Sequence, residues 1–118
     1  MRALVFLLLL LIPGPLRAAE ESPGRQVEFG LKVAQKGLWQ EARFRFERAV
    51  QLDPGNAAAH NDLAVALEQM GEFADARKAY EKALELKPGD IYIQQNYDLF
   101  READDKRNRK SRKKRPQP

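Results

Sequence analysis

The sequence matches itself when it is shifted so that Gly37 falls on Gly71. The matching positions keep glycine, alanine, leucine and proline in place, and they exchange one apolar or aromatic residue for another. A fixed period of about 34 residues, with two helical stretches and a proline-containing break in each unit, is typical of stacked helical hairpins. The matched pairs are Phe29 and Leu63, Gly37 and Gly71, Trp39 and Phe73, Ala42 and Ala76, Phe46 and Tyr80, Ala49 and Ala83, Leu52 and Leu86, and Pro54 and Pro88.

Local signals for helix starts and ends divide the chain at the same points in each unit. Ser22 before Pro23 predicts the first helix start, because serine caps helices and proline suits their first position. Gly37 and Gly71 predict helix ends, because glycine adopts the left-handed conformation without a Cβ clash. We therefore expect helices over about residues 23–36, 40–52, 57–70, 74–86 and from 91 onward, with Asn56 and Asp90 as caps.

The repeated residues resemble the tetratricopeptide repeat (TPR) family, with repeat one at residues 23–56 and repeat two at 57–90. Position 4 departs from the family pattern, with Gln26 and His60. The resemblance implies an all-α fold, a fragment of an α-solenoid, and a protein-binding rather than catalytic role. Repeat one carries it with Phe29, Gly30, Val33, Gly37, Trp39, Ala42, Phe46, Ala49 and Pro54, and repeat two with Leu63, Ala64, Leu67, Gly71, Phe73, Ala76, Tyr80, Ala83 and Pro88.

Residues 91–105 are expected to form a single capping helix after the two hairpins. At repeat positions 3, 7 and 10, which face the preceding repeat, repeat one is mainly charged and the later units are apolar. We therefore expect the last helix to be packed against the second hairpin and the first helix to be solvated. The three sets are Arg25, Phe29 and Lys32, then Ala59, Leu63 and Ala66, then Ile93, Tyr97 and Phe100.

Residues 1–18 have the order of parts of a secretory signal peptide, followed by a polar lead-in at 19–22. Arg2 precedes ten apolar residues, 3–12, and a Pro-Gly-Pro break comes before small residues suited to cleavage. Ten residues of helix span only about 15 Å, so a membrane-spanning anchor is the weaker alternative. We expect export, most simply to a bacterial periplasm, with membrane association if the leader is kept. The chain has no cysteine, which excludes disulfides and thiolate metal sites.

The charges are segregated along the chain. All 17 acidic residues lie between 20 and 105, whereas residues 106–115 contain eight basic residues and no acid. We expect 106–118 to be a disordered basic tail attracted to polyanions, an anionic membrane or wall surface in an exported protein. Nucleic acid is the partner in the alternative of a cytoplasmic protein. Two further alternatives are a merely solubilising tail and a tail that lies against the acidic body of its own chain. The candidate polyanion-binding residues are Lys106, Arg107, Arg109, Lys110, Arg112, Lys113, Lys114 and Arg115.

No arrangement of residues in the sequence points to catalysis, a metal or a cofactor. His60 is the only histidine, and without thiolates it cannot make a zinc site, so we expect it to pack within repeat two. Asp104 and Asp105 are expected to be a solvated helix end whose acids pair with Lys106 or Arg109. The sequence therefore predicts a protein without enzymatic activity.

The resemblance places the binding surface on the inner face formed by the first helix of each unit. This face mixes an apolar line with polar groups, which suits an extended peptide or an amphipathic helix. The alternative is that its apolar residues only pack between helices. A clamp for a terminal carboxylate is rejected, because its positions hold Val27, Leu31, Asp62, Tyr92 and Asn96. The candidate groove residues are Val27, Leu31, Ala34, Gln35, Asn61, Val65, Glu68, Gln69, Tyr92, Gln95, Leu99 and Glu102.

Overall fold

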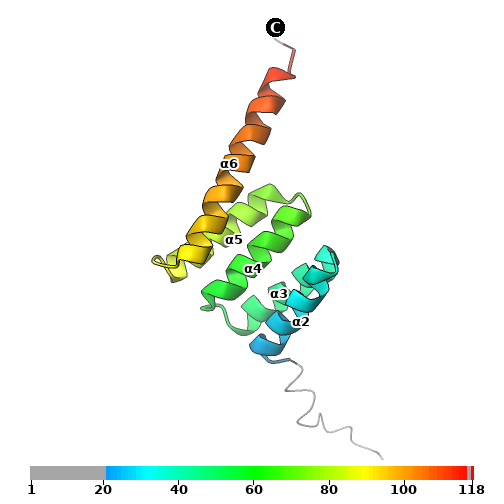
Figure 1. Ribbon diagram of the computed structural model, residues 1–118, viewed down its shortest axis with the longest axis vertical. Helices are drawn as coiled ribbons and strands as arrows, with labels where there is room; N and C mark the ends of the chain where they lie inside the picture. Colours follow the sequence, from blue (N-terminus) through cyan, green and yellow to red (C-terminus); the bar gives the residue numbers. More distant parts are fainter. Residues whose placement is uncertain (1–20, 117) are drawn as a thin grey trace, which may run out of the picture.

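The computed structural model describes residues 21–116 and residue 118, and within them it contains five α-helices and no strand. This confirms the predicted all-α fold. Helices α2 and α3 form one antiparallel hairpin, α4 and α5 form the next, and α6 lies against the second hairpin (Figure 1). The bounds are α2 Pro23–Gln35, α3 Trp39–Leu52, α4 Ala57–Gln69, α5 Phe73–Leu86 and α6 Ile91–Lys113. The predicted leader, residues 1–18, lies outside the described residues.

The turn inside each hairpin is built in the same way. Gly37 and Gly71 have φ of 74° and 78°, in the left-handed region that favours glycine. In the first hairpin, Gly37 donates to the carbonyl of Ala34 (2.9 Å) and Leu38 donates to that of Val33 (3.0 Å). The second hairpin repeats both bonds at the equivalent positions. These paired bonds satisfy the last carbonyls of α2 and α4 and direct the chain back antiparallel.

The first helix of every unit begins at a side-chain cap. The backbone N–H of Ala59 donates to Asn56 Oδ1 at 3.1 Å, and that of Ile93 donates to Asp90 Oδ1 at 3.0 Å. Ser22 caps α2 in the same way, as predicted. Each cap satisfies one of the N–H groups that a helix start leaves without a partner.

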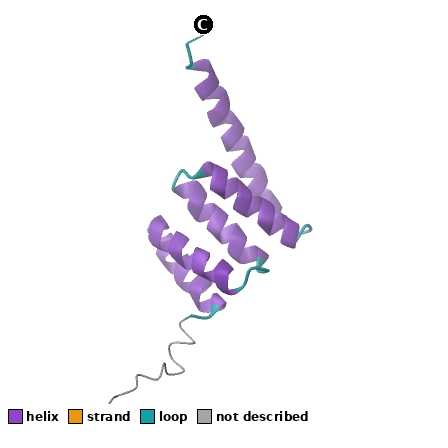
Figure 2. Cartoon of the chain, turned by 180° about the vertical axis from the view of Figure 1, so that it is seen from behind, coloured by secondary structure: helices purple, strands orange, loops and turns teal. Residues whose placement is uncertain are grey.

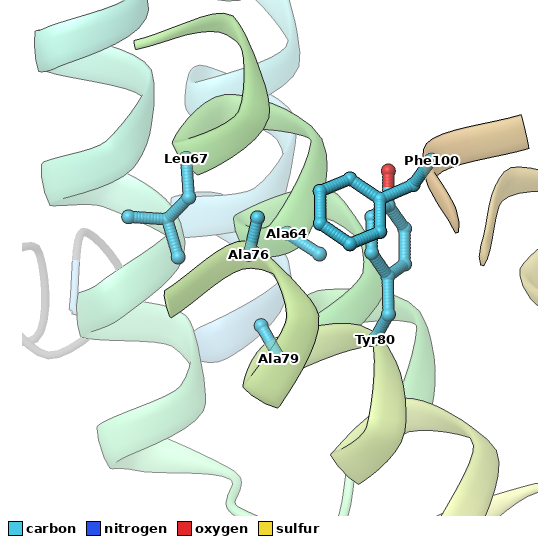
Figure 3. Packing of buried hydrophobic residues seen from close by; sticks show 6 residues of the cluster. All are labelled: Ala64, Leu67, Ala76, Ala79, Tyr80 and Phe100. Carbon is cyan, nitrogen blue, oxygen red and sulfur yellow. The ribbon is translucent and has the colours of Figure 1, made fainter. Parts of the chain in front are cut away.

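The core consists of small residues at the helix crossings beside one large aromatic ring per hairpin. Phe46 fills this place in the first hairpin and Tyr80 in the second, and both are almost fully buried. Figure 3 shows Tyr80 and Phe100 side by side, next to Ala64, Ala76, Ala79 and Leu67. The alanines let the helix axes approach closely, and the ring fills the space that remains.

Gly30 lies at a close contact between α2 and α3. A Cβ atom at this position would lie 2.5 Å from Phe46 Cε1, closer than packed carbon atoms approach. Repeat two has Ala64 at the equivalent position, and its side chain is fully buried. Helix α2 is therefore packed on the Phe46 ring through its backbone.

Helix α6 caps the second hairpin with the predicted stripe. Ile93 and Phe100 are 3% and 0% exposed, and the Phe100 ring lies 5.4 Å from that of Tyr80 between centroids. Tyr97 is half-buried, and its hydroxyl donates to Glu81 at 2.9 Å. The positions where a further helix would pack are polar and exposed, and they hold Gln94, Asp98 and Arg101. A polar outer face allows the array to end at α6 in water.

The prediction of a disordered tail after residue 105 is wrong in the structure, because α6 continues as a helix to Lys113. Its end projects beyond the second hairpin (Figure 2). Lysine and arginine are good helix formers, and extending an existing helix avoids the cost of nucleation. Cations near a helix C-terminus also interact favourably with the helix dipole. Lys106 supports this stretch by pairing with Glu102 at 2.9 Å.

The prediction that Asp104 is solvated is also wrong. Its carboxylate is buried between two helices, where it accepts from Arg77 of α5 at 2.7 Å and from Arg107 at 3.2 Å. The Arg107 guanidinium in turn lies 3.5 Å from the centre of the Phe73 ring. Hydrogen bonding from Arg77, and then from Arg107, lowers the pKa of Asp104. This network fixes α6 to α5 one turn beyond Phe100.

Candidate functional site

The inner face of the array contains a hollow of about 290 Å³, which is bounded by the first helix of each unit and by α3 of the first hairpin. Helices α2, α4 and α6 supply most of the wall, and two aromatic residues of α3 close its floor. The wall is predominantly apolar, with a few amide groups and one carboxylate. The lining residues are Leu31, Ala34, Gln35, Trp39, Phe46, Asn61, Asp62, Val65 and Asn96.

The polar side of the hollow is held by amides on neighbouring helices. Asn96 Nδ2 of α6 donates to Asn61 Oδ1 of α4 at 3.1 Å, which ties the capping helix to the second hairpin at this face. Asp62 is the only titratable residue that lines the hollow. Burial raises the pKa of Asp62 to about 6, and a hydrogen bond from Asn61 opposes the rise.

The predicted groove residues divide into three groups by their surroundings. One group of five lines the hollow together, from two different helices. The predicted inner face therefore has a concavity beside the first hairpin. The five residues are Leu31, Ala34, Gln35, Asn61 and Val65.

Four other candidates from the predicted set lie on the same three helices outside the hollow. Tyr92 and Leu99, on α6, are 79% and 66% exposed, and Gln95 lies exposed between them in sequence. Val27, on α2, is half-buried. Two large apolar side chains of α6 are therefore open to solvent beside the hollow.

The last three candidates have other surroundings. Glu68 accepts from the Tyr80 hydroxyl at 2.9 Å and so belongs partly to the core of the second hairpin. Gln69 lines a separate, wide-open hollow beside Leu38 and Phe44. Glu102 pairs with Lys106.

Sequence reasoning did not include Asp62, Asn96, Trp39 and Phe46 among the groove residues. A signal for the first two is present, because they occupy the same repeat position in successive units, each one residue after a predicted groove position. The sequence pattern assigns Trp39 and Phe46 to the core, and both do pack there as well as floor the hollow.

The predicted polyanion-binding residues differ in whether their side chains are exposed and unpaired or are held by other groups of the chain. Arg107 is half-buried against Phe73 and Asp104, Lys106 pairs with Glu102, and Arg109 donates to the carbonyl of Asp105. The remaining five are exposed and make no ion pair with any described residue. They are Lys110, Arg112, Lys113, Lys114 and Arg115.

The described residues contain no group of three side chains able to hold a metal ion. His60 is half-buried, and its Nε2 lies 2.8 Å from the carbonyl oxygen of Pro54, close to its own helix start. No helix in the described part of the chain is both long enough and apolar enough to cross a bilayer.

Comparison with protein families gives a match to the model described as Tetratricopeptide repeat, over residues 34–95. The matched segment spans more than half of the chain, from the end of α2 into α6. The chain belongs to the tetratricopeptide repeat family. Comparison with curated proteins gives no match. Members of the TPR family generally serve as non-enzymatic protein–protein interaction modules.

Proposed function

We propose that this TPR protein is an exported adaptor that holds a peptide or helical segment of a partner protein on its inner face. The observation that carries the proposal is the surface around the hollow. Leu31, Tyr92 and Leu99 are 44%, 79% and 66% exposed, although large apolar residues are normally buried. Leu31 lines the hollow, and Tyr92 and Leu99 lie one helical turn before and after Asn96, which also lines it. The amide donors and acceptors of the hollow beside these apolar side chains are the mixture that a bound segment needs.

A selection experiment tests this role. The full-length chain is used to select binders from a random peptide library, and the peptides are then measured against two variants. Leu31→Glu and Leu99→Glu together should abolish binding, because they place charge on the apolar rim. Phe44→Glu is the matched control, since Phe44 is 57% exposed on α3 and does not line the hollow. Binding that survives the double variant and is lost in the control would place the site elsewhere.

The free cations at the end of α6 support a second part of the proposal, electrostatic attraction to an anionic membrane or wall surface. Three of the five unpaired residues lie in the last turns of α6 and two follow its end, and α6 carries no apolar side chain after Ala103. Such a helix cannot insert into lipid, so the attraction is electrostatic. Each cation near an anionic bilayer contributes roughly 1 kcal/mol before screening by salt.

Vesicle binding tests this second part. The five residues are changed to glutamine, and Lys36, Lys78 and Lys82 are changed to glutamine in a control variant. Anionic vesicles should retain the wild type and the control at low salt, and release both as salt increases. Equal binding by the five-residue variant would contradict the proposal. Binding to duplex DNA but not to vesicles would instead favour the nucleic-acid alternative.

Export rests on the leader-like residues 1–18. N-terminal sequencing of the protein from its own cells should give a start near Ala19, and an intact Met1 on soluble protein from the cytoplasm would contradict export.

A further inference from the structure

The lining of the hollow carries negative charge and no positive charge. Asp62 is the only charged residue in its lining, and no Lys or Arg of the described chain pairs with it. Its one hydrogen-bond partner, Asn61, is a neutral amide, which donates to Asp62 and accepts from Asn96 through its oxygen. A partly buried carboxylate without a cation is unfavourable, because burial removes solvating water and nothing replaces the lost charge stabilisation.

The shape and walls of the hollow limit what can neutralise this carboxylate. Its volume of about 290 Å³ is at the small end of ligand pockets, so it accommodates one or two side chains rather than a whole ligand. Leu31, Ala34 and Val65 provide apolar wall, and the amide side chains of the lining carry oxygen acceptors. Apolar walls with a carboxylate match a side chain that has a hydrocarbon stem and a cationic head.

We propose that the hollow is a specificity pocket for a basic residue, lysine or arginine, of the peptide that the groove binds. This inference rests on the proposed function and names the chemistry of the partner. The stem of the basic residue packs on Leu31 and Val65, and its head donates to the Asp62 carboxylate and the neighbouring amide oxygens. An acidic side chain at this point is repelled, and an aliphatic one leaves the Asp62 carboxylate without a cation.

The cations of α6 do not fill the pocket. Arg101 lies over the ring of Tyr97, 5.6 Å from its centre. Of the basic residues that follow, Lys110 is the first whose charge is free, and it lies about four helical turns beyond Asn96, which lines the hollow. Four turns correspond to about 21 Å along a helix, directed away from the hairpins. No cation of the described residues occupies the pocket, so we assign the basic residue to a partner molecule.

Three nine-residue peptide libraries test the proposal. They are identical except for the central position, which is lysine, norleucine or glutamate, and norleucine reproduces the stem of lysine without its charge. Each library is measured against the full-length wild type and against Asp62→Asn, which removes the charge and keeps the shape. Asp98→Asn is the matched control, because Asp98 is an exposed carboxylate on α6 that does not line the hollow.

For the wild type and the Asp98→Asn control, the lysine library should bind at least tenfold more tightly than the norleucine library, and the glutamate library most weakly. Asp62→Asn should bind the lysine and norleucine libraries within twofold of each other. A lysine preference that survives Asp62→Asn would overturn the proposal, and so would equal binding of all three libraries to the wild type.

Failure of groove binding as a whole gives a different result from failure of the basic pocket alone. If peptides bind and the Leu31 and Leu99 variant abolishes binding, but no central residue is preferred, the groove is real and the basic pocket is not. If no library binds the wild type at all, the groove function and the pocket both fail. A synthetic peptide of residues 106–118 that binds as tightly as the best lysine peptides would make a second copy of this chain the occupant and overturn the assignment to a partner.

Discussion

Phe100→Ala is expected to destabilise the whole array by removing the main apolar contact of α6. The Phe100 side chain is fully buried among Ala64, Leu67, Ala76 and Tyr80, and no other described element covers this end of the second hairpin. Replacing a fully buried phenylalanine by alanine costs about 3–5 kcal/mol in unfolding free energy. Domains of this size are stable by about 5–15 kcal/mol, so this is a large fraction of the total.

Urea denaturation followed by far-ultraviolet circular dichroism measures this loss of unfolding free energy. With a slope near 2 kcal/mol per molar urea, the midpoint should fall by about 2 M. Leu99→Ala is the control, because this neighbour on α6 is 66% exposed and should change the unfolding free energy by no more than about 0.5 kcal/mol. Trp39, the only tryptophan, lies in the first hairpin and reports its unfolding separately by fluorescence.

Coincident transitions by the two probes would show that loss of the cap spreads to the first hairpin. A Phe100→Ala midpoint equal to that of Leu99→Ala would refute the packing of α6 described above.

Three further perturbations test individual contacts. Asp62→Asn should raise the unfolding free energy by up to about 2 kcal/mol at pH 8 and leave it unchanged at pH 4, because a carboxyl whose folded pKa is raised to about 6 stabilises the fold only when it is protonated. Urea midpoints measured across pH 4–8 test this, and a difference that does not change with pH would contradict it. Asp104→Asn should lower the unfolding free energy, measured by urea denaturation, by about 2 kcal/mol near neutral pH, because Arg77 and Arg107 lose their shared carboxylate. The folded pKa of Asp104 is lowered, so this loss should vanish at acid pH, where the wild-type carboxyl is protonated. A loss that persists at acid pH would argue against the ion pair. Gly37→Ala and Gly71→Ala should each lower thermal stability by about 1–2 kcal/mol, because alanine is strained at positive φ. Gly55→Ala, at a glycine without positive φ, should change it very little. Equal effects at all three positions would show that the two turns do not require a left-handed residue.

The helices could be predicted because their ends depend on local chemistry. Gly37 and Gly71 are needed for left-handed turns, and Asn56 and Asp90 cap the helices that follow them, so a short stretch of sequence determines each boundary. The stripe on α6 could be predicted for a different reason. Comparing one set of repeat positions across three units shows that the last unit is apolar where the first is mainly charged.

The extension of α6 could not be predicted from composition, because a run of basic residues has the same composition in a helix and in a disordered tail. The structure adds two contacts to the helix propensity of this stretch: Asp104 accepts from Arg77, 27 residues earlier in the chain, and Arg107 lies over the ring of Phe73. Neither contact leaves a periodic pattern in the sequence.

Sequence reasoning missed the Asp62 pocket for a similar reason. The sequence places Asp62 next to the groove positions, but its isolation from every cation of the described chain depends on the side chains that three other helices bring around it.

The inner face of this TPR protein, and not its outer face, is proposed to bind the partner. Methyl-selective nuclear magnetic resonance of leucine and valine residues, recorded while the tightest lysine-library peptide is added, tests it most directly. Shifts are expected at Leu31, Val65 and Leu99, with Leu38 and Leu52 unchanged. Shifts at Leu38 or Leu52, with Leu31 and Val65 unchanged, would contradict it.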